Sequence, residues 1–464
     1  MPLSVLERAI VWLTDGVWGP WQTPVGQIPG PLVVLLMGVS IYLTLRLRFI
    51  QVVRFPQAVR AMVPQRPTGG RGVLTPFQTF TTALAATIGM GNIAGVATAV
   101  VSGGPGAVFW IWCYGFFAMA TKFTEAVLGI SFRVTRADSL WSGPPYYLRD
   151  GLKLPWLAWT YALVAGVAAL TTTPFTQPNS IALVLDSQLA VPKWLTGVGV
   201  AVLTWLVIIG GIKSIGRAVE KLAPLKVLLY LAGGLIVIGY HAAEVPEVFA
   251  TIIREAFSFK AGTGATAGLA IMVAMRYGLA RGVYANEAGY GTAAVVYGTA
   301  RSDRPGQQGL NAVMEVFLVS FVTSSISALT ILVSGVWQSG LTSTAVVAQA
   351  FDTAIPGGGF IVALCAFLFG YTALIGWAYY GEQFLEYVFG ARVIIPYRWI
   401  YCVLILFGAV ARVDIVWAWG DLMNGLQVFP NVIGIVALSG FAVAAARTLR
   451  RRPGTAGRTP TPPQ

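Results

Sequence analysis

One stretch, Ala83-Leu-Ala-Ala-Thr-Ile-Gly-Met-Gly-Asn-Ile-Ala-Gly95, limits the folds that this chain can adopt. It lies in a long apolar run, yet Gly89, Gly91 and Asn92 stand near the middle of that run. An interior glycine weakens a helix by up to about 1 kcal/mol relative to alanine, and asparagine competes for backbone hydrogen bonds. The stretch therefore predicts a broken helix. The alternative is a tight helix crossing through Gly91 and Gly95.

The composition around this stretch is that of a membrane protein. Of the 464 residues, 56% are hydrophobic and only 11% are charged, and the mean hydropathy is +0.71. A soluble domain carries about 25% charged residues. Within lipid, an opened backbone is tolerated only where it lines a protein cavity or binds a ligand. We therefore expect the break to belong to a binding site.

Apolar runs separated by charged or Pro/Gly-containing breaks predict eleven membrane-spanning helices. The predicted class is an all-α polytopic membrane protein, with an interfacial segment before residue 31. The expected spans are 31–49, 79–103, 105–129, 157–188, 195–212, 222–241, 263–298, 309–337, 357–381, 396–411 and 429–446.

The positive charges predict the orientation of these spans. Alternate connections hold most of the Lys and Arg residues, whereas the other set holds only Arg8, Lys193, Arg254, Lys260 and Arg412. Because cytoplasmic loops concentrate Lys and Arg, we expect an external N-terminus and a cytoplasmic C-terminus in the cell (inner) membrane. The net charge of +13 is then a topology signal, and no nucleic-acid partner is expected. Contact with membrane lipid is expected, including anionic headgroups at the Arg- and Pro-rich tail.

The span 263–298 predicts a second interruption. It contains Arg276, Arg281 and Glu287, together with Gly278, Gly282, Gly289 and Gly291. Discontinuous helices at matching places in two halves indicate a secondary transporter built from inverted repeats. The predicted organisation is an N-terminal segment with one extra helix (1–78), two five-helix repeats (79–241 and 263–446) and a disordered tail (447–464).

Other residue counts exclude several classes of protein. The only histidine is His241, and Cys113, Cys365 and Cys402 lie in apolar runs, so no disulfide framework, zinc site or Ser-His-Asp triad is expected. No enzymatic activity is therefore predicted.

The residues 89–94 match a dinucleotide-binding pattern but lack its strand and its acidic residue. Lys122 and Glu125, three residues apart, predict a local ion pair.

Several longer motifs resemble the alanine or glycine:cation symporter family. They are Leu84-Ala-Ala-Thr-Ile-Gly-Met-Gly-Asn-Ile-Ala-Gly-Val-Ala97, Gly103-Gly-Pro-Gly-Ala-Val-Phe-Trp110, Met119-Ala-Thr-Lys-Phe-Thr-Glu125, Arg276-Tyr-Gly-Leu-Ala-Arg-Gly282, Asn286-Glu-Ala-Gly289 and Gly376-Trp-Ala-Tyr-Tyr-Gly-Glu382. The resemblance implies a leucine-transporter-like core of five plus five helices that imports small neutral amino acids with sodium. It implies no cofactor, and a monomer is expected.

The resemblance also implies a substrate site at the two breaks. The amides of Met90 and Gly91 would hold the substrate carboxylate at a helix N-terminus, and the backbone around Tyr277 and Gly278 would receive the amine. Such a site would contain no fixed counter-charge. The implied substrate-binding residues are Thr87, Gly89, Met90, Gly91, Asn92, Phe175, Gln177, Tyr277, Gly278 and Trp377.

For the cation, the resemblance implies the carbonyls of Ala85 and Ile88 and the hydroxyl of Thr372. Many relatives carry two threonines where this chain has Thr372-Ala373, so one hydroxyl ligand is missing. Sodium-coupled uptake is the expected function, and a proton-coupled or sodium-independent transporter of the same fold is the alternative. An amino-acid sensor is a further alternative, although the tail after Arg447 is too short for an output domain.

Overall fold

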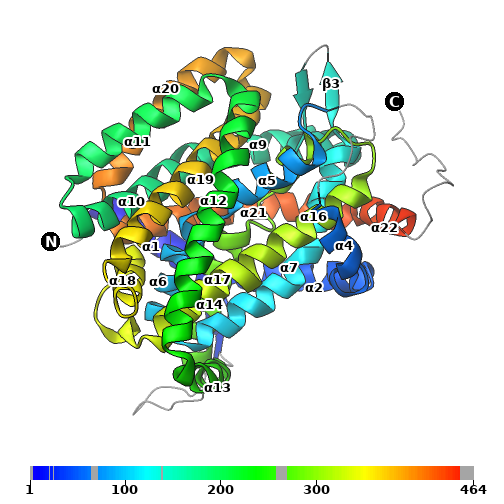
Figure 1. The fold of residues 1–464 in the computed structure, drawn as a ribbon. Helices are drawn as coiled ribbons and strands as arrows, with labels where there is room; N and C mark the ends of the chain where they lie inside the picture. The colour runs from blue at the N-terminus through cyan, green and yellow to red at the C-terminus, as the bar shows by residue number, and fades with distance from the viewer. Residues whose placement is uncertain are drawn as a thin grey trace.

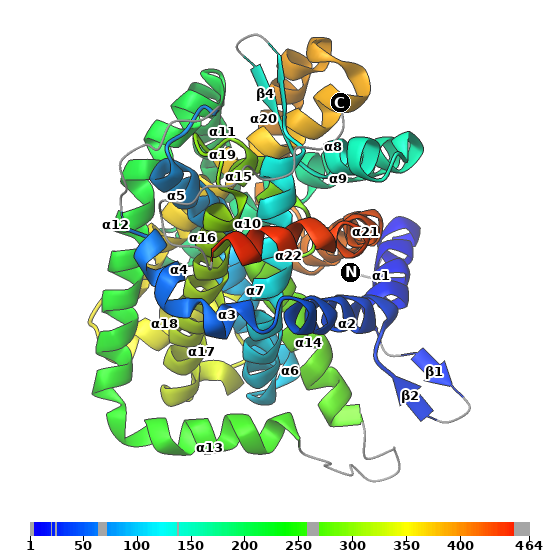
Figure 2. The same cartoon turned by 90° about the vertical axis from the view of Figure 1, so that its right-hand side faces the viewer.

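The two interrupted helices lie side by side in the computed structural model, which describes residues 4–19, 21–23, 26–63, 72–136, 139–257 and 269–449. Almost all of the described chain is helical (Figures 1 and 2). Two short hairpins form the exceptions, with β1 paired antiparallel to β2 and β3 paired antiparallel to β4. An all-α fold is what the apolar runs predict.

The elements of the first half begin with the amphipathic helix α1 and end with the surface helix α13. Their bounds are α1 (Val5–Trp18), β1 (Trp21–Thr23), β2 (Gly26–Ile28), α2 (Pro31–Arg46), α3 (Ile50–Val53), α4 (Phe55–Ala61), α5 (Pro76–Thr87), η1 (Met90–Asn92), α6 (Ala94–Gly103), α7 (Gly106–Ser131), β3 (Val134–Arg136), β4 (Ser139–Trp141), α8 (Pro144–Tyr146), η2 (Tyr147–Gly151), α9 (Pro155–Thr171), α10 (Thr173–Leu189), α11 (Lys193–Ile208), α12 (Gly211–Tyr240), η3 (Ala242–Glu244) and α13 (Val245–Ala256).

The second half starts with the other interrupted helix. Its elements are α14 (Leu269–Asn286), α15 (Thr292–Gly298), α16 (Pro305–Phe317), η4 (Leu318–Thr323), α17 (Ser324–Val333), η5 (Val336–Gln338), α18 (Ser343–Asp352), α19 (Gly358–Phe389), η6 (Ala391–Val393), α20 (Ile394–Val410), α21 (Val413–Ala437) and α22 (Ser439–Thr448).

The first break lies where the sequence predicts it. Helix α5 begins with a capping box between Thr75 and Gln78, has Pro76 in its first turn, and ends at Thr87. The chain then bends by 58° into the segment Met90–Gly103. The residues Ile88, Met90 and Asn92 at the bend are fully buried, so the opened backbone is enclosed by protein.

The second break lies between Asn286 and Thr292, where three residues have positive φ. Glu287 has φ 57°, Gly289 has φ 97° and Gly291 has φ 88°. Side chains from other helices satisfy the opened backbone: one Glu125 carboxylate oxygen accepts from the amides of Gly289 and Gly291, each at 3.0 Å. An interruption in the predicted span is thus present, but it is about ten residues beyond Tyr277 and Gly278, which lie within the continuous helix α14.

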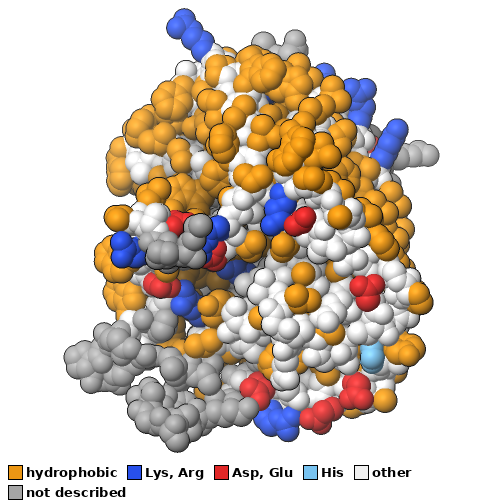
Figure 3. All heavy atoms as spheres, turned by 90° about the vertical axis from the view of Figure 1, so that its left-hand side faces the viewer, with side chains coloured by type: hydrophobic (Ala, Val, Ile, Leu, Met, Phe, Trp, Pro, Cys, Tyr) orange, Lys and Arg blue, Asp and Glu red, His pale blue; other side chains and the backbone are white. Residues whose placement is uncertain are grey.

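Large apolar side chains are exposed along α11, α12 and α20, as a lipid-facing surface requires. In the view of Figure 3, hydrophobic side chains gather in the upper part of the molecule, whereas most of the visible charged side chains lie across its middle and at its lower edge. Among the described residues, five helices are long and apolar enough to cross a membrane, or up to seven if each bent pair counts as one span. Eleven spans therefore remain a prediction.

The last predicted span, 429–446, is misplaced. The helix there is α21, which starts at Val413 and turns by 55° into α22. The early part of α21 contains Asp421, which is buried in an ion pair with Arg281. Helix α1 packs against α21. The predicted disordered tail, 447–464, begins within α22, which ends at Thr448. From residue 450 onward the tail lies outside the described residues.

Candidate functional site

A small buried cavity lies between the two breaks. Its volume is about 10 Å³, roughly the room that one water molecule needs. Its lining comes from both interrupted helices and from α10, α19 and α21: Ala86, Thr87, Gly89, Gly91, Thr173, Gln177, Tyr284, Glu287, Tyr290, Trp377 and Asn424. A bound molecule larger than water requires this lining to move apart.

Gln177 of α10 reaches directly into the first break. Its Oε1 accepts a hydrogen bond from the backbone N–H of Met90 at 3.0 Å. A Cβ atom on Gly89 would stand 2.9 Å from the Ala373 Cβ and 3.2 Å from the Gln177 Oε1. The break therefore offers a backbone donor to the cavity, and only glycine leaves room for the side chains around it.

Glu287 supplies a carboxylate on the opposite side of the cavity. Its Oε1 accepts from the Trp377 indole N–H at 2.6 Å, and its Oε2 accepts from the Thr292 hydroxyl at 2.7 Å. The side chain is buried. This cavity therefore contains a carboxylate, unlike the site expected from the sequence, because the second break turns this acidic residue toward the cavity.

Half of the predicted substrate residues line the cavity. They are Thr87, Gly89, Gly91, Gln177 and Trp377, and Met90 joins them through its amide. The cavity residues that sequence reasoning missed are Ala86, Thr173, Tyr284, Glu287, Tyr290 and Asn424. Glu287 alone carried a signal, as an acidic residue among glycines in an apolar span.

Four predicted residues do not line the cavity. Asn92 turns toward α17, where its Oδ1 accepts from the Ser324 hydroxyl at 3.1 Å. Phe175 packs against the backbone of Gly408, and Gly278 packs against Ala107 and Trp110. Tyr277 lies beside Gly103. For Tyr277 and Gly278 the cause is the position of the break: a continuous α14 has no open carbonyl to offer there.

A cluster of buried charged residues contacts the helices next to both breaks. Lys122 forms an ion pair with Glu315 at 3.1 Å. The two Glu315 oxygens accept from the hydroxyls of Thr87, at 2.6 Å, and Tyr297, at 2.9 Å. The predicted Lys122–Glu125 pair is wrong, because Glu125 instead binds the backbone amides of the second break.

The three predicted cation ligands also come together, but around a lysine. The Nζ of Lys226, on α12, donates to the carbonyl oxygens of Ala85 at 3.0 Å and Ile88 at 2.5 Å. It also donates to the Thr372 hydroxyl at 2.5 Å. Sequence reasoning missed Lys226, although a lysine inside the predicted span 222–241 is the kind of intramembrane charge that signals a site.

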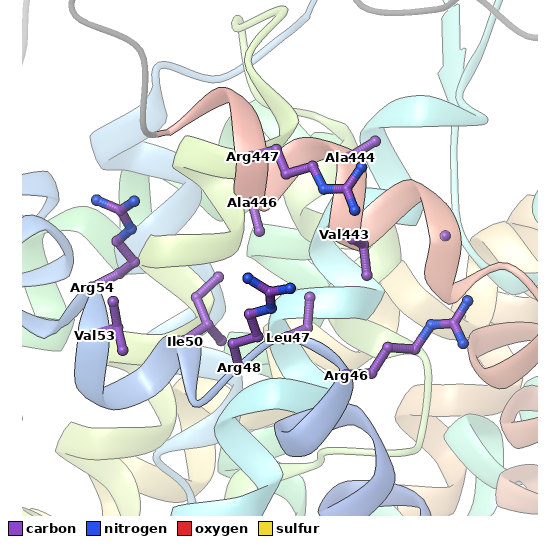
Figure 4. Close-up of a pocket in the computed structure, with 11 residues that line it drawn as sticks. Arg46, Leu47, Arg48, Ile50, Val53, Arg54, Val443, Ala444, Ala446 and Arg447 are labelled. Carbon is purple, nitrogen blue, oxygen red and sulfur yellow. The ribbon is translucent and has the colours of Figure 1, made fainter.

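A second cavity, of about 520 Å³, is lined by basic and apolar residues between the end of α2, α3 and α22 (Figure 4). Arg46, Arg48, Arg54 and Arg447 surround it. It contains none of the residues predicted to bind substrate, and its size and exposure differ from those of the cavity between the breaks.

Comparisons with known proteins agree with this architecture. The model of the sodium:alanine symporter family matches residues 21–461. The sodium/alanine symporter AgcS of Methanococcus maripaludis is 39% identical over 443 residues, which cover 93% of this chain and 94% of that protein. The probable sodium/glutamine symporter GlnT of Bacillus subtilis is 32% identical over 453 residues, covering 97% and 92%.

A solved structure with a similar fold is that of MhsT in complex with L-phenylalanine. Its TM-score is 0.57 at 13% identity, and the match covers 82% of this chain and 97% of that chain. The chain thus has a leucine-transporter-like fold. Its relatives are symporters rather than enzymes, and a co-transported sodium ion is consistent with their names. By the extent of these matches, the chain belongs to the sodium:alanine symporter family.

Proposed function

We propose that this chain is a secondary active transporter that imports a small neutral amino acid, of the alanine, glycine or serine class, by alternating access. One observation carries the proposal: a closed cavity lies between two broken helices, with a backbone N–H on one side and a carboxylate on the other. These groups match the two charges of a zwitterion. The name of the sodium/alanine symporter AgcS supports the same substrate class.

The substrate carboxylate is expected at the first break. The Met90 N–H lies at the start of the segment that continues into α6, where the helix dipole favours an anion. The Gln177 Oε1 now accepts from that N–H. A carboxylate would take over the backbone donor, and the Gln177 amide, after turning, would donate its own N–H to the substrate.

The substrate amine is expected beside Glu287. This carboxylate lines the cavity, and among the described residues its oxygens accept from two neutral donors, Trp377 and Thr292. An ammonium group would add a charge-assisted hydrogen bond, which is stronger than a neutral one. Glu287 thus takes the role that the family resemblance implied for the backbone around Tyr277 and Gly278.

The aromatic side chains favour a small substrate. Tyr284, Tyr290 and Trp377 line the cavity, and all three are buried. Tyr284 is held by a 2.7 Å hydrogen bond with the Thr176 hydroxyl, and Trp377 is held by Glu287. Because hydrogen bonds hold the side chains of Tyr284 and Trp377, a large substrate side chain would have to break these hydrogen bonds to enter the cavity.

Two ways of coupling amino-acid uptake to an ion are compatible with this site. The names of the family and of its relatives favour sodium. A sodium-independent or proton-coupled transporter is the second candidate, favoured by the single hydroxyl of Thr372-Ala373 and by the ammonium of Lys226 among the predicted cation ligands.

Counterflow in proteoliposomes tests the transport function without assuming a coupling ion. Vesicles loaded with unlabelled alanine are expected to take up labelled alanine, and excess glycine or serine should compete. Vesicles without protein provide the baseline. Failure to exchange alanine, glycine, serine or any other neutral amino acid would contradict the proposal, and binding without exchange would instead indicate a sensor.

Replacing Glu287 with Gln tests the amine site. We expect the affinity for alanine to fall about tenfold, since a charge-assisted hydrogen bond becomes a neutral one. The exposed Glu247, on α13, provides the control Glu247→Gln. Equilibrium binding of labelled alanine gives the dissociation constants, and equal affinity in both variants would place the amine elsewhere.

We also propose that the N-terminus is external and that the cytoplasmic side carries the basic loops. The arginines around the cavity of Figure 4 would then face anionic lipid headgroups. A reporter that is active only in the cytoplasm, fused after Gln464, is expected to be active. Activity of a periplasmic reporter at the same position would reverse the assignment.

A further inference from the structure

Three oxygen atoms form a cage around the Nζ of Lys226. Its side chain is fully buried, and its Nζ donates to two backbone carbonyls and one hydroxyl. A lysine ammonium has three donors and no acceptor, so these three acceptors use all of its donors. The Phe369 ring lies 5.0 Å from the same nitrogen, a distance at which a ring face attracts a cation.

The carbonyl oxygens of this cage lack their helical N–H partners because the helix breaks there. In a continuous helix the Ala85 and Ile88 oxygens would accept from the N–H groups four residues onward. Those N–H groups belong to Gly89 and Asn92, which donate instead to the carbonyls of Thr87 and Gly89. The end of α5 also carries the negative end of the helix dipole, so the break creates a cation site and Lys226 fills it.

Lys226 differs in its partners from the other buried cations of the described residues. Lys122 pairs with Glu315, Arg281 with Asp421, and Arg398 with Glu382. None of the ion pairs in the described ranges includes Lys226, whose charge is balanced by dipoles and a hydroxyl. A structural lysine at this depth would normally have a carboxylate partner. The three oxygens are instead the neutral, hard ligands that suit a small exchangeable cation.

The residues implied for the sodium ion therefore do not fit a free ion in this chain. Nζ occupies the point on which the oxygens converge, and a second cation there would be repelled by the ammonium. Ala373 supplies no additional hydroxyl beside Thr372. We infer that Lys226 is a tethered cation that replaces the co-transported sodium at this position, so that amino-acid uptake does not require sodium. The inference rests on the proposed transport function and specifies its coupling.

The first test compares sodium with choline in proteoliposomes containing the unaltered protein. We expect the initial rate of alanine counterflow to stay within about twofold when choline replaces sodium, because the ammonium already completes the cation site. Sodium should likewise leave the melting temperature of the unaltered protein unchanged, relative to choline at equal ionic strength. A rate that falls at least about tenfold without sodium would overturn the inference.

The second test removes the tethered cation. Lys226→Ala exposes the carbonyls of Ala85 and Ile88 and the Thr372 hydroxyl to an added ion. We expect this variant to lose counterflow in choline and to recover it at least about tenfold in sodium. Lys221→Ala is the matched control, since Lys221 is an exposed lysine on the same helix, and it should behave as the unaltered protein does.

Stability provides a readout that does not depend on transport. Sodium is expected to raise the melting temperature of Lys226→Ala but not that of Lys221→Ala, because only the first has an open cation site. If Lys226→Ala folds and shows neither sodium-dependent stabilisation nor sodium-dependent counterflow, Lys226 is only a structural residue and the inference fails. If Lys226→Ala does not fold, the sodium dependence of the unaltered protein decides alone.

These outcomes separate the two proposals. Absence of counterflow for every neutral amino acid, with or without sodium, contradicts the proposed function. Counterflow that exists but requires sodium in the unaltered protein leaves the transport function intact and overturns the assignment of Lys226 alone.

Discussion

Gly91 illustrates how closely the first break is packed against the second helix. A Cβ atom there would stand 2.8 Å from the Tyr284 Cδ1 and 3.3 Å from the Ala285 Cα, which is too close for ordinary contact. The two broken helices can approach each other at the cavity only because this position has no side chain.

Replacing Gly91 with Val is expected to abolish measurable alanine binding, because the added side chain would push Tyr284 into the cavity. The affinity should fall by more than about a hundredfold, because valine both overpacks the site and prevents the close approach of the two broken helices. Gly199→Val is the control, since a Cβ atom added at Gly199 would have no other atom within 4 Å. Equilibrium binding on folded protein measures both, and unchanged affinity in Gly91→Val would put the substrate elsewhere.

Replacing Gln177 with Ala is expected to weaken alanine binding about fivefold, the effect of one net hydrogen bond of ~1 kcal/mol. The Met90 N–H would lose its partner in the free protein and the substrate would lose a donor. Gln188→Ala, near the other end of the same helix, should bind alanine as the unaltered protein does. If the two variants bind equally, Gln177 is only an interhelical contact.

The residues of the first break could be predicted because the signal is local. Gly89, Gly91 and Asn92 interrupt one apolar run, and the bend follows from them. The contacts of Glu287 and Lys226 could not be predicted in this way, because their partners come from other helices: Trp377 from α19, and Ala85 and Ile88 from α5. Spacing along one segment contains no information about such contacts.

The second interrupted helix depends on side chains that lie far away in the sequence. Glu125 of α7 binds two of its amides, and Asn431 of α21 donates to the carbonyl of Gly289 at 2.8 Å. Tyr161 of α9 donates to the carbonyl of Tyr290 at 2.6 Å. The glycines predict that a break exists in 263–298, but these distant partners determine where it lies.

Gly289→Ala is expected to lower the free energy of unfolding by about 1–3 kcal/mol, because an alanine at φ 97° is strained. Its Cβ would also meet the Leu36 Cδ2 at 2.7 Å. Gly239→Ala, on the exposed side of α12, should instead raise the free energy of unfolding. Alanine favours a helix, and no other atom would lie within 4 Å of the added Cβ atom. Thermal unfolding in detergent compares the stabilities of the two variants. Equal changes in stability would show that the backbone at Gly289 is not strained by alanine.

Glu315 connects the regions of the two breaks, which belong to the two halves of the molecule. This one carboxylate binds Thr87 at the first break, Tyr297 after the second break, and Lys122 of α7. Movement of either break therefore changes the contacts of the other. Such a connection is what alternating access requires, since the two halves must rearrange together around the substrate.

Replacing Glu315 with Gln is expected to destabilise the protein by ~3–5 kcal/mol, because Lys122 would keep a buried charge without its partner. The double variant Lys122→Met, Glu315→Gln should recover part of that loss, since the uncompensated charge is removed. Melting temperatures of both single variants and the double variant form the cycle. Strictly additive effects would show that the pair does not interact.

The cage around Lys226 also affects how the membrane potential acts on transport. An ion that dissociates carries its charge across the bilayer, and each elementary charge gains or loses about 2.3 kcal/mol per 100 mV. The ammonium of Lys226 is covalently attached to α12, and a neutral amino acid carries no net charge. At this position no dissociating ion would therefore carry charge across the bilayer, and the membrane potential would not act on transport through this cation site.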